Sequence, residues 1–196
     1  MKRKLLIFIA ALAVSPAIAQ NPIDISVATD RWASEKNVFV TKSARNQLNE
    51  FLVASLTNSV GLPKDSLSAL GQELRDTGSL RIARAPTRSP GLFSVQTTGG
   101  AVQVTPEQAS VLGKLLSMES ISSWLERFPS VRVVVQPAPP IDYSIAINGE
   151  KCPPEKGLYR VPAGLVKVQV TRSGKAPCIW HGSLLQGQVQ DVSCSL

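Results

Sequence analysis

The chain has 196 residues and a formal net charge of +7, and it contains three cysteines but only one histidine. This length suits one domain or two small ones. One histidine and cysteines without a C-x-x-C spacing exclude a conventional zinc site. No metal or other cofactor is therefore expected.

The first 19 residues have the three parts of a secretory signal peptide. A basic stretch at 2–4 precedes ten apolar residues at 5–14, and the small-x-small pattern at 17–19 predicts cleavage before Gln20. Ten apolar residues are too few to cross a hydrocarbon core of about 30 Å as a helix. We therefore expect a periplasmic or secreted protein, with no transmembrane segment after cleavage.

Cleavage removes three basic residues and leaves a net charge of +4 on the mature chain. Because an exported protein rarely meets nucleic acid, no nucleic-acid partner is expected. The remaining positive charge is typical of a solvated surface, and it also suits weak attraction to an anionic envelope polymer or to lipid headgroups.

The first elements predicted after the leader are two helices. Leu48, Leu52 and Leu56 lie at helical spacing, and this stripe stops at Gly61. A second helix is expected over about 64–76.

Three short strands are expected next, at 79–85, 92–96 and 101–104. The side chains of the first alternate between apolar and polar. The sequence TTGG between the other two predicts that they form a hairpin.

Two further helices and a strand follow. Thr105 suits a helix cap, Pro106 the first helical position, and Gln108 the reciprocal capping-box position. The next helix is expected from a capped turn at Ser120, and alternating valines at 131–135 predict a strand. The apolar face expected on this second helix comprises Ile121, Trp124, Leu125 and Phe128. We interpret that face as core and not as a ligand groove.

Three arginines, Arg81, Arg84 and Arg88, lie in a stretch that contains no acidic residue. They are either incidental charges on a solvated turn or a contact for an anion or a partner. No glycine-rich phosphate cradle precedes a helix in this stretch.

Three prolines within residues 136–140 (QPAPP) predict a stiff connector at 137–140. The sequence therefore predicts an α+β fold, with a small mixed α/β domain at 20–136 and a small all-β domain, sandwich or meander, at 141–196.

The expected all-β domain contains strands at 141–148, 158–161 and 165–171, followed by two more in its last 20 residues. This order of strands and turns resembles the PEGA domain, a small β module common in bacterial envelope and surface proteins. The matching residues are Ile147-Asn148-Gly149 and the run from Tyr159 to Leu165 that leads into VKVQVTRSGKAP.

The PEGA tetrapeptide itself is missing, and residues 152–156 (CPPEK) replace the usual glycine–threonine–proline turn. The resemblance implies a non-catalytic interaction or spacer module, and it supplies no site residues.

Residues 176–194 predict a closing hairpin. If its loop has three residues, Gly187 takes the left-handed position and Cys178 lies opposite Cys194. An oxidising compartment favours a disulfide between these two cysteines and leaves Cys152 as the odd thiol. Pairings that involve Cys152 stay open.

The same register places His181 opposite Asp191, with Ser193 on the same face. These are the residue types of a hydrolase triad. We interpret them as surface residues, because an open hairpin has neither a nucleophile elbow nor an evident oxyanion hole.

Together these features favour an exported, non-catalytic interaction or assembly protein of the bacterial cell envelope. Its expected partner is another envelope protein or an anionic envelope polymer. Two alternatives are an envelope hydrolase with a carboxylate-based site in the N-terminal domain and a carrier for a hydrophobic ligand.

Overall fold

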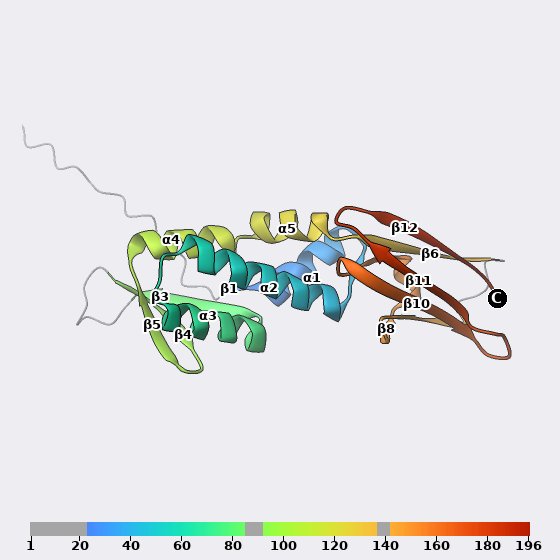
Figure 1. Cartoon of the computed structure of the whole chain (residues 1–196), viewed down its shortest axis with the longest axis horizontal. Coiled ribbons are helices and arrows are strands. Elements are labelled where there is room, and N and C mark those ends of the chain that lie inside the picture. The colour runs from blue at the N-terminus through green and yellow to red at the C-terminus, as the bar shows by residue number, and fades with distance from the viewer. Residues whose placement is uncertain (1–22, 85–91, 137–141) are drawn as a thin grey trace, which may run out of the picture.

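The computed structural model describes residues 23–84, 92–136 and 142–196. The α+β prediction is confirmed: a mixed helical and β part comes first, and an all-β part follows. The molecule is elongated, with most helices toward one end and a β-sandwich at the other (Figure 1). In the ranges that are described, no helix is both long and apolar enough to cross a membrane. The predicted leader at 1–19 lies outside these ranges.

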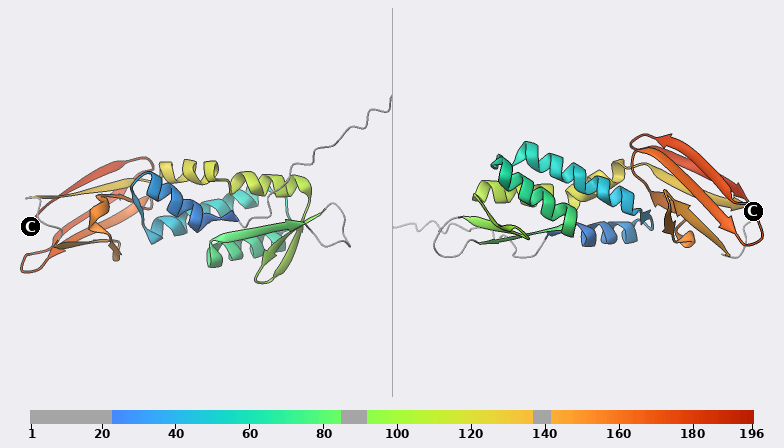
Figure 2. Two further views of the ribbon diagram at one scale, coloured as in Figure 1. Left: turned by 180° about the vertical axis from the view of Figure 1, so that it is seen from behind. Right: turned by 60° about the horizontal axis from the view of Figure 1, so that its bottom comes forward.

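The first part, which we call the α/β part, packs helices against an antiparallel sheet with the order β1-β3-β4-β5. Figure 2 shows this sheet beside the helices from two further directions. The helices are α1 (Ile25–Glu35), α2 (Lys42–Ser59), α3 (Lys64–Thr77), α4 (Pro106–Leu115) and α5 (Met118–Arg127). The strands are β1 (Ile23–Asp24), β3 (Ser79–Arg84), β4 (Phe93–Thr97) and β5 (Gly100–Val104).

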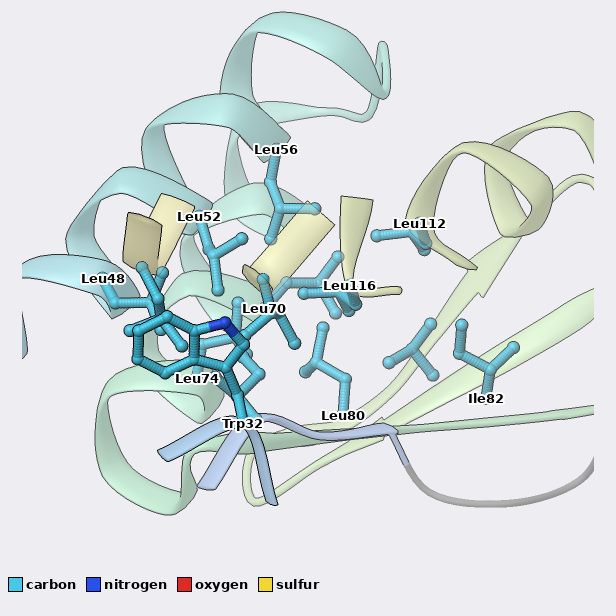
Figure 3. Close-up of a cluster of buried hydrophobic side chains, with 14 of the residues drawn as sticks. Trp32, Leu48, Leu52, Leu56, Leu70, Leu74, Leu80, Ile82, Leu112 and Leu116 are labelled. Carbon is cyan, nitrogen blue, oxygen red and sulfur yellow. The ribbon is translucent and has the colours of Figure 1, made fainter. Parts of the chain in front are cut away.

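Leucines from the helices and the sheet fill the core of the α/β part (Figure 3). The predicted helices at 48–60 and 64–76 correspond to α2 and α3, and the predicted hairpin corresponds to β4 and β5. The capping box of α4 is also confirmed. Helix α5 begins earlier than predicted, because the Ser117 hydroxyl caps it by accepting a hydrogen bond from the Ser120 N–H.

The second part, which we call the β-sandwich, consists of two four-stranded sheets with one shared core. The first sheet has the order β11-β10-β7-β8 and is antiparallel, and the second has the order β12-β6-β9-β2 and is mixed. The strands of the first sheet are β7 (Tyr143–Ile147), β8 (Glu150–Cys152), β10 (Gly164–Arg172) and β11 (Cys178–Leu184). Those of the second are β2 (Phe39–Val40), β6 (Ser130–Gln136), β9 (Leu158–Arg160) and β12 (Val189–Ser195).

The predicted boundary after residue 136 does not separate the two cores. Strand β6, which precedes it, pairs with β12 and β9 inside the β-sandwich. Val131 of β6 is fully buried in the sandwich core. The connector predicted at 137–140 lies outside the described residues, and the strands that precede and follow it in the chain, β6 and β7, both belong to the sandwich. The division between the two cores lies near Phe128, because Phe128 belongs to the first core and Val131 to the second.

The predicted hairpin at 176–194 is wrong. Strand β11 pairs with β10, whereas β12 crosses to the other sheet and pairs in parallel with β6. Gly187 nevertheless has the predicted left-handed conformation, with φ at +74°. The crossing lets β12 add to the edge of β6, whose backbone groups would otherwise lack a partner on that side.

The Cys178–Cys194 disulfide is confirmed, with a Cα–Cα separation of 5.7 Å. It links the two sheets of the sandwich and is not a bond between paired strands. Cys152 is free and buried. Across the sheet, Cys152 pairs with Ile145, Ile145 pairs with Val170, and Val170 pairs with Cys178. Three strand spacings therefore separate Cys152 from Cys178. At about 4.8 Å per strand, roughly 14 Å separates it from the disulfide.

The α/β part and the β-sandwich are joined by polar contacts around Arg160 of β9. One guanidinium nitrogen, Nη1, donates a hydrogen bond of 2.7 Å to the Phe128 carbonyl at the end of α5. The guanidinium also lies over the ring of Trp32 from α1, at 5.5 Å from the ring centroid. Burial lowers the pKa of Arg160. These contacts fix how the two parts meet.

Candidate binding groove

The sequence offered Arg81, Arg84 and Arg88 as a possible contact, and the structure describes the side chain of Arg81. Arg81 lies exposed in β3, opposite Gln96 of β4. Arg84 ends the same strand, where its backbone pairs with Phe93. Arg88 lies outside the described residues.

Arg81 lines a polar hollow of about 290 Å³ together with Glu73 of α3. The Glu73 carboxylate is buried and accepts a hydrogen bond of 2.6 Å from the Thr98 N–H. This bond ties the β4–β5 turn to α3. The hollow thus contains a carboxylate that has a structural role.

The triad residue types are not brought together. His181 lies on β11 opposite Lys167 of β10. Asp191 lies on β12 in the other sheet, where its carboxylate is 3.5 Å from the Arg132 guanidinium. Ser193 follows on the same strand. The interpretation of these residues as surface residues holds, although the register on which it was based is wrong.

A hollow of the α/β part runs along α4 and α5, and we call it the α4–α5 groove. It is open to solvent and has a volume of about 610 Å³. Its serines are Ser110, Ser117, Ser120 and Ser123. Lining residues recur at intervals of three and four along both helices, so one face of each helix forms the groove while the other is buried in the core.

One wall of the α4–α5 groove is a stack of three side chains. Trp124 stacks on Phe51 of α2, with 5.1 Å between ring centroids and an interplanar angle of 24°. The guanidinium of Arg127 lies over the Trp124 ring at 5.2 Å from its centroid. The stack therefore holds an exposed cation in a defined place at one end of the groove.

Three charged residues line the groove: Lys114, Glu119 and Arg127. Among the residues that the structure describes, no ion pair involves either cation. Gly113 also lines the groove, and a Cβ added there would meet no atom within 4 Å. The glycine thus leaves open the space that a larger side chain would fill.

Trp124 was predicted to be core, and that prediction is only partly right. Ile121, Leu125 and Phe128 are fully buried, but Trp124 is half-buried and lines the groove. A sequence signal was present, because the polar residues Ser120 and Arg127 lie four residues before and three residues after Trp124, on the same side of the helix.

A carboxylate-based hydrolase would need two carboxylates that face one hollow. The α4–α5 groove contains Glu119, the hollow at Arg81 contains Glu73, and a third hollow contains Glu50, which pairs with Arg75. Each of these hollows has one carboxylate. In the described ranges, no group of three or more His, Cys, Asp or Glu side chains is placed to hold a metal.

A carrier for a hydrophobic ligand would need an enclosed apolar cavity. The three hollows described above are open and contain polar or charged side chains. Their geometry suits recognition of a polar partner at the surface.

The thiol of Cys152 is not poised for chemistry. Burial raises its pKa to about 12, and the carboxylate of Glu150 adds to this shift. Burial also raises the pKa of Tyr159, whose hydroxyl donates a hydrogen bond to the Pro153 carbonyl. Both groups stay protonated at neutral pH and belong to the sandwich core.

No family model matches the chain, and a search of the curated proteins finds no significant match.

Proposed function

We propose that this protein is an exported interaction protein of the bacterial cell envelope that binds a partner through the α4–α5 groove. The observation that carries the proposal is the groove itself. It is an open hollow with serine hydroxyls, a stacked tryptophan and two cations that have no carboxylate partner in the described part of the chain. Tryptophan and arginine are the residues most often found at the energetic centre of protein interfaces.

The joint between the two parts supports a role in assembly. The turn between β11 and β12 donates a hydrogen bond of 2.7 Å from the Gly187 N–H to the Arg127 carbonyl. The Gln188 carbonyl accepts another, of 2.8 Å, from the Ser130 N–H. The groove therefore ends against the β-sandwich, which presents it at a fixed angle and acts as a rigid spacer.

Export is proposed from the leader pattern at residues 1–19, and the Cys178–Cys194 disulfide suits an oxidising compartment. A PEGA-like role for the sandwich rests on the residue pattern after Ile147. The export proposal predicts a mature protein that begins at Gln20 and is recovered outside the cytoplasm, which N-terminal sequencing of fractionated cells can check.

Photo-crosslinking in cells tests the groove. A photoreactive phenylalanine analogue at Ser123, an exposed groove position, should form a discrete crosslinked species with one partner. The control places the same analogue at Lys167, which is exposed on the outer face of β10. Crosslinks of equal yield at both positions, or none at Ser123, would contradict the proposal.

A further inference from the structure

We infer that the partner of the α4–α5 groove is an acidic, extended polypeptide segment, in which a carboxylate binds Arg127 and a neighbouring apolar side chain contacts the β11–β12 turn. This inference rests on the proposed function, because it names the chemistry of the partner for the same groove.

The charged side chains of the groove indicate the chemistry of its ligand. Lys114 lines the groove on α4 and Arg127 on α5, and in the described residues neither pairs with a carboxylate. Of the exposed acids nearby, Glu126 lies 3.7 Å from Lys36, and Glu119 lines the groove without an ion pair to either cation in the described residues. A carboxylate from another chain is the group that these two cations lack.

Arg127 is preorganised for this contact. Its guanidinium lies on Trp124, and Trp124 is in turn held by Phe51. A stacked guanidinium keeps its planar set of donors in one orientation, so less side-chain entropy is lost when it forms a bidentate pair with a carboxylate. A flexible lysine at the same place would lack this advantage.

Two exposed apolar side chains flank the turn that meets the Arg127 end of the groove. Leu185 in the β11–β12 turn is 74% exposed, and Val189 at the start of β12 is 56% exposed. The turn between them is hydrogen-bonded to the Arg127 carbonyl through the Gly187 N–H. Exposed apolar side chains beside a cationic groove fit a segment in which acidic and hydrophobic residues are neighbours.

These features favour a polypeptide over a polyanionic polymer. A polymer with a charge on every unit would meet Glu119 in the groove, and it would gain nothing from Leu185 or Val189. Helix α5 has ten residues, so it is about 15 Å long. About five residues of an extended chain span that length.

Peptide selection on the purified mature protein tests the inference. A displayed library of random 12-residue peptides is enriched on the wild type and on the charge-reversed variant Arg127→Glu. We expect wild type to enrich Asp or Glu next to Leu, Ile or Phe. Arg127→Glu should enrich Lys or Arg instead, and it should weaken the best wild-type peptide about tenfold or more.

Two further variants separate binding from folding. Gly113→Leu fills the groove without changing its charge, and it should weaken the same peptide to a similar extent because the added side chain extends into open space. Lys167→Glu is the matched control for Arg127→Glu, since it makes the same change in net charge on the far sheet. It should leave peptide affinity and selection unchanged.

Three outcomes would overturn the inference: identical peptides selected on wild type and Arg127→Glu, no enrichment of acidic residues, or Arg127-dependent binding of alginate in place of peptide. The proposed function has its own test. If Ser123 crosslinks a protein in cells while selection shows no acidic preference, the groove still binds a partner and only the chemistry inferred here is wrong.

Discussion

The α/β part and the β-sandwich are stabilised in different ways. The core of the α/β part draws large aliphatic side chains from all five of its described helices and from its sheet, and contains no cysteine. The sandwich has a smaller core, in which valine is the commonest residue, and a disulfide that links its two sheets. A small core buries less apolar surface, so the covalent link carries more of the stability there.

Strands of the β-sandwich nevertheless lie between elements of the α/β part in the chain. Strand β2 lies between α1 and α2 of the α/β part, yet it pairs with β9 in the sandwich. Strand β6 continues directly from α5 and forms the centre of a sandwich sheet. We therefore expect the two cores to unfold together as one unit.

The largest expected effect comes from breaking the larger core. Leu52→Ala removes a fully buried side chain of α2 and should lower the free energy of unfolding by about 2–5 kcal/mol. Because β2 and β6 couple the parts, Trp180 in the sandwich should report the same shift as Trp32 in the α/β part. Variants that keep only one of the tryptophans can measure both. Two separate transitions would show that the parts unfold independently.

Removing the disulfide should weaken the sandwich most directly. Replacing Cys178 and Cys194 by alanine opens a link with a sequence separation of 16, which constrains the unfolded chain by about 3 kcal/mol. Denaturant unfolding should show this loss, and adding reductant should destabilise the wild type but not the double variant. Equal stability of the double variant and the oxidised wild type would show that the disulfide does not stabilise the sandwich.

Two glycine-to-alanine substitutions compare the packing of the sandwich with that of the groove, because each adds one methyl group. At Gly182 in β11, an added Cβ would collide with the ring of Trp180, which packs against the sandwich core. Gly182→Ala should therefore cost about 1–3 kcal/mol. The matched Gly113→Ala change enters open space on a helix and should stabilise by up to about 1 kcal/mol. Thermal unfolding of both variants compares them, and a neutral Gly182→Ala would contradict the packing of Trp180.

The sequence predicted elements that are fixed by local signals. The α4 capping box, the TTGG hairpin and the left-handed Gly187 all depend on residues close in the chain, and all are confirmed. It did not predict β2 or the parallel pairing of β12 with β6, because these depend on residues about 60 to 120 positions apart. Helix α1 was also missed, although Asp24 caps it and Trp32 lies on its buried face.

The groove was harder to predict than the fold. Trp124 reads as a core residue when its apolar neighbours are considered, and its exposed edge depends on how α4 and α5 meet. The predicted hairpin register gave the right disulfide for the wrong reason. Alternation along each strand turns Cys178 and Cys194 toward the core, and this holds whether the two strands pair in a hairpin or lie in two stacked sheets. The side of a strand on which a residue lies is set locally by the sequence, whereas the partner strand is set by the whole fold.

The pH dependence of Cys152 is a smaller effect that is confined to the sandwich. Its pKa of about 12 in the folded protein lies above that of an unfolded thiol. Stability from this group is therefore complete below about pH 8 and is lost as the pH rises toward 12. Iodoacetamide should not alkylate Cys152 at pH 8 unless the protein is unfolded. Cys152→Ala should flatten the fall in stability above that pH, and rapid alkylation of the native protein would contradict the burial.

The smallest effect is expected for His181→Ala. The histidine is exposed on the outer face of β11, across from Lys167 and on a different sheet from Asp191. Truncating an exposed side chain with no special role usually changes stability by less than about 0.5 kcal/mol. Crosslinking at Ser123 and peptide binding should also be unchanged, because the α4–α5 groove lies in the other part of the molecule. Asp191→Asn serves as the companion variant, since it removes the charge paired with Arg132 and should be equally mild. If both variants abolished an activity while circular dichroism showed an intact fold, the two residues would have to act together, and the separation of β11 from β12 would be incorrect.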